Sequence, residues 1–273
     1  MEAPPGRPDR SAVEAPAGRP ESSAFSSALA LGTWLATRGA LVRASLAMAA
    51  LGALGAIAAA VATRGTPALS SVPGVASLAF AWGAGTTLAF GCALRAIRHD
   101  REHGILALAR ARGVGPGTYS SGRVAGLVIV LLIAVGGGTL VAGLAATAAA
   151  GGAAPAVGRA SAAALAYSLA FALTMGPVAM AALGGRTRGG AYFALLMVLV
   201  LPEVLAPWTQ RLLPDGWHEV TSIPAALEAV RAGVLSAGSA CLHAIRGAVA
   251  LLAVVAASLL VVRARVPADA VDA

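Results

Sequence analysis

The sequence contains no lysine, so all 20 of its basic residues are arginines. The phosphate-binding loop written G-x-x-x-x-G-K-[ST] needs a lysine that reaches the β- and γ-phosphates of the nucleotide. The chain therefore holds no such loop, and ATP hydrolysis of this kind must come from a partner. The chain also lacks the zinc-enzyme pattern H-E-x-x-H and the nucleophile pattern G-x-S-x-G. We therefore expect that it is not an enzyme.

Charged residues and cysteines are both scarce. Only 12% of the residues are charged, about half the fraction found in soluble domains, whereas 58% are hydrophobic. The two cysteines, Cys92 and Cys241, form no C-x-x-C pair, so neither a metal site nor a disulfide framework is indicated, and no cofactor is implied. This composition places the chain in a lipid bilayer rather than in water.

Six apolar runs are long enough to cross a membrane. A helix that rises about 1.5 Å per residue needs about 20 residues to cross a hydrocarbon layer of about 30 Å. We therefore expect an all-α, polytopic membrane protein with six transmembrane helices. The predicted spans cover about residues 44–63, 76–98, 124–149, 160–184, 190–208 and 244–262.

The arginines are distributed unequally between the segments that connect these spans. Six spans put both termini on one side, and the segments of that side hold fifteen arginines against five on the other. Because arginine is enriched in cytoplasmic segments, we expect cytoplasmic termini. The same distribution accounts for the net charge of +8 without a nucleic-acid partner.

The two ends of the chain differ from the spans in composition. Residues 1–23 are rich in proline, glycine and charge, and we expect a disordered cytoplasmic tail. Residues 24–43 are mildly apolar and end in two arginines, which suits an amphipathic helix along the membrane interface, although the ragged start of the first span fits equally well. Residues 44–264 then form the six-helix domain, and residues 265–273 form a second cytoplasmic tail.

The longest charged connection follows the second predicted span and runs from Arg95 to Arg123. Its first half is amphipathic, with apolar positions such as Ile97 and Leu108 opposite alternating charges. Glycine and proline at 113–117 then end the helical pattern. Two hypotheses fit this pattern. The segment is either a short helix on which a soluble motor pushes, or a solvated interfacial loop.

This connection resembles one in the permeases of type-2 ATP-binding-cassette (ABC) exporters. After their second span, those permeases carry an acidic-basic-acidic run, then Gly-Thr-Leu and a leucine-rich turn, and then a Gly-Lys that opens the third span. The family's threonine is Ile105 here, and the second leucine cluster is diluted to Ala109 and Arg110. The matching positions are Asp100, Arg101, Glu102, Gly104, Leu106 and Gly122-Arg123.

A second resemblance lies between the fifth and sixth predicted spans. The family often has a proline, a few apolar residues and then an arginine there, as in the segment Ile223–Arg231 of this chain. Independently of the family, Ser222 is suited to cap a helix, and apolar residues recur on one face of the segment. We therefore expect a short amphipathic helix on the extracellular side.

The resemblance implies a permease subunit in the bacterial cytoplasmic (inner) membrane. It implies a homodimer or heterodimer of permeases that exports an unidentified substrate by alternating access, driven by a separate ABC ATPase. The helix after the second span is then the coupling helix that docks on that ATPase. Its candidate contacts are Asp100, Arg101, Glu102, Gly104 and Leu106. Two alternatives stay open, namely a permease of a haem or copper cofactor-maturation system, and a membrane anchor or scaffold without transport.

Two further residues are candidates for the substrate path. Glu203 is the one acidic residue inside an apolar run, and ionisable residues within a membrane are often functional. It lies roughly 20 Å along the fifth predicted span, close to the outer interface. Pro177 interrupts the fourth predicted span, where a kink would serve either gating or packing.

Overall fold

The computed structural model describes residues 21–94, 96–184, 188–213, 217, 220–236 and 241–266. All regular elements within these ranges are helices. Six helical stretches among them are long and apolar enough to cross a membrane. The all-α class and the presence of six helices long and apolar enough to cross a membrane are therefore confirmed for the described part of the chain. Of the predicted tails at 1–23 and 265–273, residues 1–20 and 267–273 lie outside the described residues, and residues 21–23 are helical.

The helices follow one another along the chain with short connections. The first half comprises α1 (Glu21–Ala36), α2 (Ala40–Ala62), η1 (Pro67–Ser71), α3 (Val72–Leu78), η2 (Ala79–Gly85), α4 (Thr86–Ala93), α5 (Ala96–Glu102), α6 (Ile105–Ala111) and α7 (Pro116–Leu131). The second half comprises η3 (Leu132–Gly136), α8 (Gly137–Ala149), η4 (Gly151–Ala153), α9 (Ala154–Leu183), α10 (Arg188–Leu199), α11 (Leu201–Leu212), α12 (Ile223–Leu235) and α13 (Cys241–Ala264). Of the elements labelled η, η1 and η4 are 3₁₀ helices, whereas η2 and η3 are π-helical segments within longer helices.

Glycine and proline set two of the boundaries. Gly39 has a φ of 130°, which L side chains rarely adopt, and it separates α1 from α2. The helix predicted over 24–43 is therefore divided between these two helices. α10 and α11 form one crossing stretch, Gly189–Leu212, whose regular hydrogen bonding is interrupted at Val200, two residues before Pro202, which has no N–H to donate.

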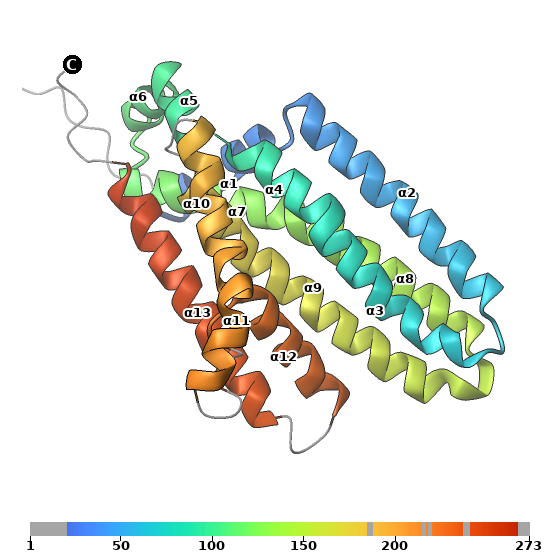
Figure 1. Cartoon of the computed structure of the whole chain (residues 1–273). Helices are drawn as coiled ribbons and strands as arrows, with labels where there is room; N and C mark the ends of the chain where they lie inside the picture. Colours follow the sequence, from blue (N-terminus) through green and yellow to red (C-terminus); the bar gives the residue numbers. More distant parts are fainter. Residues whose placement is uncertain are drawn as a thin grey trace, which may run out of the picture.

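The connections gather at two ends of the bundle (Figure 1). The short helices α5 and α6 project from one end, beside the start of α10 and the end of α13. We call this the hairpin end and the opposite one the far end. α12 lies in the half of the bundle toward the far end, against α9 and α13. The arrangement agrees with six helices that cross in alternating directions.

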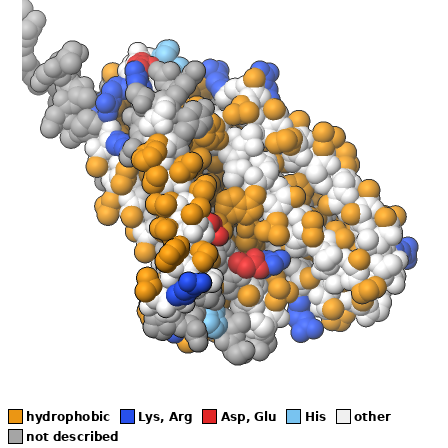
Figure 2. All heavy atoms as spheres, viewed as in Figure 1, with side chains coloured by type: hydrophobic (Ala, Val, Ile, Leu, Met, Phe, Trp, Pro, Cys, Tyr) orange, Lys and Arg blue, Asp and Glu red, His pale blue; other side chains and the backbone are white. Residues whose placement is uncertain are grey.

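The core is built around α9, which is the most buried of the six crossing helices. Its inward side chains include Tyr167, Phe171 and Met175, all fully buried. In contrast, α2, α10, α11 and α13 leave most of their apolar surface exposed. Figure 2 shows many hydrophobic side chains spread over the face in view, as expected for a surface in contact with lipid or with another membrane subunit.

Small residues let α1 pack directly on α7. A Cβ atom added at Gly126 would lie 2.4 Å from the backbone of Gly32, and one added at Gly122 would lie 2.7 Å from the backbone of Ala28. Real Cβ contacts are not so short, so the two helices approach each other only because these positions are glycines. Small residues allow the same close packing between helices in membranes generally.

We predict that Gly126→Ala destabilises the protein by about 1–3 kcal/mol, the usual cost of overpacking, because the methyl group must push α1 away from α7. Gly137→Ala is the matched control, since a Cβ atom there meets no atom within 4 Å. The midpoint of thermal denaturation of each variant in detergent measures the difference. Equal midpoints for the two variants would show that α1 and α7 do not depend on this contact.

Candidate functional site

The predicted coupling segment folds as two short helices joined by a tight turn. α5 ends at Glu102, α6 begins at Ile105, and Gly104 between them has a φ of 67°. Glycine adopts this left-handed conformation without the steric cost that other residues pay. We call residues 96–111 the α5–α6 hairpin. Gly104, one of the predicted coupling residues, is therefore the residue that lets the hairpin turn.

A buried ion pair holds the hairpin to the bundle. The Nε and Nη2 atoms of Arg123 in α7 donate to the two carboxylate oxygens of Asp100 at 2.7 and 3.1 Å. The hydroxyl of Tyr119 donates to the same carboxylate at 2.5 Å. Asp100 is 1% exposed and Arg123 is 5% exposed. Two-pronged contacts between arginine and a carboxylate are among the stronger hydrogen-bonded pairs in proteins, and they fix orientation as well as distance.

Hydrogen bonds to three backbone carbonyl groups also hold the hairpin and the ends of its neighbouring helices together. The amide groups of Ile97 and Arg98 donate to the carbonyl of Gly184, just after α9, at 3.0 and 3.2 Å. The side chain of Arg101 donates to the carbonyl of Arg265, just after α13, at 2.7 Å. Arg265 in turn donates to the carbonyl of Ala181 in α9. The hairpin is thus bonded to α7 and to the ends of α9 and α13.

The predicted coupling residues divide between the inside and the outside of the hairpin. Asp100 and Leu106 are buried, so their side chains do not form its surface. Arg101, Glu102 and Gly104 are exposed. The exposed face also carries Leu108, which is 55% exposed and is the large apolar residue that α6 presents outward.

The hairpin also carries two histidines on one face. The rings of His99 and His103 lie 3.9 Å apart between centroids, and both residues are exposed. Over the described ranges of the chain, no group of three or more histidine, cysteine, aspartate or glutamate side chains is placed to hold a metal ion. These two rings are therefore surface groups of the hairpin.

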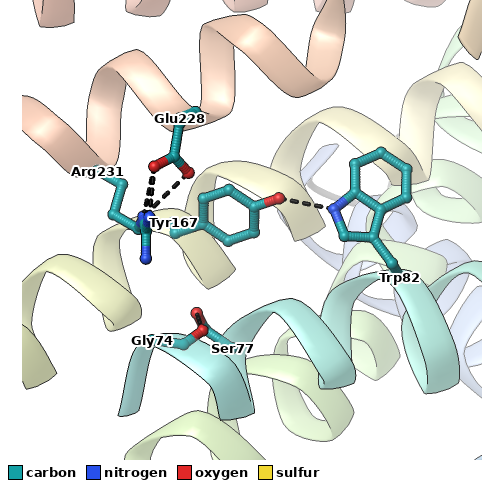
Figure 3. Close-up of polar contacts among 6 residues, drawn as sticks. All are labelled: Gly74, Ser77, Trp82, Tyr167, Glu228 and Arg231. Carbon is teal, nitrogen blue, oxygen red and sulfur yellow. Dashed lines mark hydrogen bonds and ion pairs between the residues drawn. The ribbon is translucent and has the colours of Figure 1, made fainter. Parts of the chain in front are cut away.

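A second polar cluster lies away from the hairpin, within the half of the bundle toward the far end. On α12 the guanidinium of Arg231 donates to both carboxylate oxygens of Glu228, with Nε distances of 3.0 and 2.9 Å. The same guanidinium reaches α3, where it would lie 3.1 Å from a Cβ atom at Gly74. Figure 3 shows this pair directed toward Tyr167 and the Gly74–Ser77 turn of α3. The pair therefore bridges α12 and α3.

Aromatic side chains lie next to this pair. The indole N–H of Trp82 donates to the hydroxyl of Tyr167 at 2.7 Å (Figure 3). The ring of Trp82 also packs edge-on against Phe171, with centroids 5.4 Å apart. Figure 2 shows acidic side chains, with a basic one beside them, in the middle of a face that is rich in hydrophobic side chains. Charged groups in such surroundings are costly and are commonly functional when they occur within a membrane.

The predicted substrate-path residues do not come together. Glu203 on α11 is exposed and accepts a hydrogen bond from the hydroxyl of Ser222. That hydroxyl also accepts from the amide of Ala225 at 3.0 Å, which confirms the predicted cap of α12. Pro177 is buried in α9 about 9 Å from its end at Leu183, whereas Glu203 lies about 21 Å along the crossing helix that starts at Gly189.

No protein-family model, curated protein or solved structure matches this chain. The resemblance to exporter permeases therefore depends on the sequence positions quoted above.

Sequence reasoning missed the contacts that build both clusters. Tyr119 and Arg123 occur 19 and 23 positions after Asp100, and only the fold brings them to its carboxylate. The contact between Trp82 and Tyr167 joins positions 85 residues apart. The sequence did contain a signal for the ion pair of Glu228 and Arg231. The two residues are spaced i, i+3 in a helix that the sequence predicted, and oppositely charged side chains at this spacing commonly meet.

We predict that Asp100→Asn lowers the free energy of unfolding by about 3–5 kcal/mol, because it leaves the buried guanidinium of Arg123 without its counter-charge. The double variant Asp100→Leu/Arg123→Met replaces the pair by apolar groups and is expected to lose much less. Reversible unfolding in mixed detergent measures both values.

The matched control for this prediction is Glu102→Gln, which breaks the exposed pair with Arg98 on the same helix. Exposed pairs contribute little, so this change is expected to cost less than about 1 kcal/mol. A loss for Asp100→Asn no larger than that of the control would contradict the assignment of Asp100 as the main brace of the hairpin.

Proposed function

We propose that this chain is a permease subunit of a type-2 ABC exporter in the bacterial cytoplasmic membrane. In this proposal two permeases, identical or different, pair in the bilayer and move a substrate outward by alternating access. A separate ATPase docks on the α5–α6 hairpin and supplies the energy. The braced hairpin is the observation that carries the proposal.

The bracing supports a role in transmitting force. A helix of seven residues is not stable alone in water, so α5 and α6 depend on their contacts with the bundle. Those contacts reach α7 and the ends of α9 and α13, which are three of the crossing helices. A push on the hairpin is therefore passed to several crossing helices together rather than absorbed by a loose loop.

The surface of the hairpin supports a protein partner. It presents the exposed side chain of Leu108 on α6 and the exposed ion pair of Arg98 and Glu102 on α5. Protein interfaces usually combine apolar anchors with polar groups at the rim. This chain carries no lysine-containing phosphate-binding loop, so in this proposal the ATP is hydrolysed by the partner.

The polar cluster around Glu228 and Arg231 is proposed as part of the substrate route. Glu228 and Arg231 are partly exposed on an apolar face, and Glu203 lies on the neighbouring α11, tied to the start of α12. In this proposal α12, which packs against α9 and α13, connects the substrate route to these two helices. The face of the bundle made by α10 and α11, which is largely exposed, is available to the second permease.

We predict that Leu108→Asp reduces ATPase recovery at least tenfold when the tagged chain is co-expressed with ABC ATPases that have no membrane domain and is purified in detergent. A tenfold loss corresponds to about 1.4 kcal/mol, which is modest for an apolar anchor at the centre of an interface. The control is Arg263→Ala, an exposed arginine at the same end outside the hairpin.

Two results would count against the proposal. If no ATPase is retained by the unaltered chain, the membrane-anchor hypothesis becomes the better one. If ATPase is retained equally by the unaltered chain and by Leu108→Asp, the partner binds elsewhere. The rate of ATP hydrolysis by the retained partner distinguishes an exporter from an anchor. Asp100→Asn loosens the hairpin, and it is expected to change this rate only if the hairpin transmits force.

A further inference from the structure

An apolar groove of about 520 Å³ runs between α2 and the stretch formed by α3 and η2. Its volume falls within the range of roughly 300–1,000 Å³ that is typical of small-molecule sites. It is lined by Met48, about a third of the way along α2, and by Thr63 at the C-terminal end of that helix, so it extends about 22 Å along α2. One leaflet of a bilayer is about 15 Å thick in its hydrocarbon part. The groove is therefore long enough for a complete acyl chain.

Glycines keep this groove open. Gly55 on α2 and Gly83 on η2 both line it, and a Cβ atom at either position would meet nothing within 4 Å. The floor is the buried ring of Phe80, which fits between Gly52 of α2 and Gly138 of α8 at distances that leave no room for a side chain on either. The groove is therefore tightly packed at its floor, around Phe80, and open beside Gly55 and Gly83.

The backbone beside the groove is unusual. Residues Ala79–Gly85 form a π-helical segment, and Leu132–Gly136, which packs against them, form another. Segments of π-helix are rare and occur frequently at functional sites. The widened turn includes Phe80 and Gly83, two of the residues that line the groove.

An exposed arginine follows directly on the polar end of the groove. Thr63 and Ser71 line it there, and the exposed Arg64 follows Thr63 directly. No acidic residue occurs between Glu21 and Asp100 in the sequence, so this part of the chain carries no carboxylate to oppose Arg64. Arginine is well suited to bind phosphate groups.

From these observations we propose that the groove binds one anionic phospholipid, with an acyl chain along α2 and the phosphate group at Arg64. The lipid belongs to the leaflet at the far end and fills the space between the first crossing helix and the second. This binding does not depend on the exporter proposal, because it uses the bilayer that surrounds any membrane protein of this fold.

Native mass spectrometry of the detergent-purified chain, titrated with phosphatidylglycerol, tests the proposal. We expect one tightly bound phosphatidylglycerol per chain in the unaltered protein and in the control Gly137→Leu, where the added side chain enters open space away from the groove. Gly55→Leu and Gly83→Leu fill the groove and are expected to raise the apparent Kd at least tenfold. Leucine favours helix more than glycine does, so these changes do not remove helical stability.

Two further measurements separate the acyl contact from the phosphate contact and guard against variants that do not fold. Arg64→Ala is expected to weaken phosphatidylglycerol several-fold more than phosphatidylcholine. A phospholipid with a photoreactive acyl chain is expected to label α2 and η2 of the unaltered protein in preference to α10 and α13.

Equal binding by the groove variants and the control, or labelling spread evenly over the apolar surface, would overturn the proposal. So would a groove substitution that leaves lipid binding intact and instead dissociates a dimer, because the groove would then be covered by a second copy of the chain.

Discussion

The buried pair of Asp100 and Arg123 is the interaction on which the arrangement of the hairpin end depends. Removing two charges from water is costly, and the cost is recovered only when the geometry is good and the remaining lone pairs are bonded. Here the guanidinium meets both carboxylate oxygens, and the hydroxyl of Tyr119 adds a third contact. Such a pair tolerates little displacement, so it fixes the position of α5 relative to α7.

The rest of the hairpin end follows from that fixed position. With α5 in place, its first amide groups meet the carbonyl after α9, and Arg101 meets the carbonyl after α13. Gly104 then turns the chain so that α6 buries Leu106 and exposes Leu108. The crossing helices and the exposed surface of the hairpin are thereby one connected unit. The proposed coupling role depends on this connection.

The sequence predicted the features that depend on composition and local pattern. The apolar runs predicted six crossing helices, and Ser222 predicted the cap of α12. It did not predict that Asp100 is buried, because an acidic residue in a charged run looks like a solvated one until Tyr119 and Arg123 are folded against it. The contact of Trp82 with Tyr167 was missed for the same reason, since it joins distant positions with no shared local pattern. The roles of the exposed hairpin residues, of Glu203 and of Pro177 stay predictions.

Amide hydrogen exchange of residues 96–111 in the detergent-purified protein tests the central claim most directly. Two isolated seven-residue helices would exchange their amides almost as fast as an unfolded chain, so slow exchange there measures the bracing itself. The account predicts slow exchange in the unaltered chain, and fast exchange confined to this segment when Asp100 is changed to asparagine, with α8 unchanged as the internal reference. Fast exchange in the unaltered chain, or exchange that the substitution leaves unchanged, would contradict it.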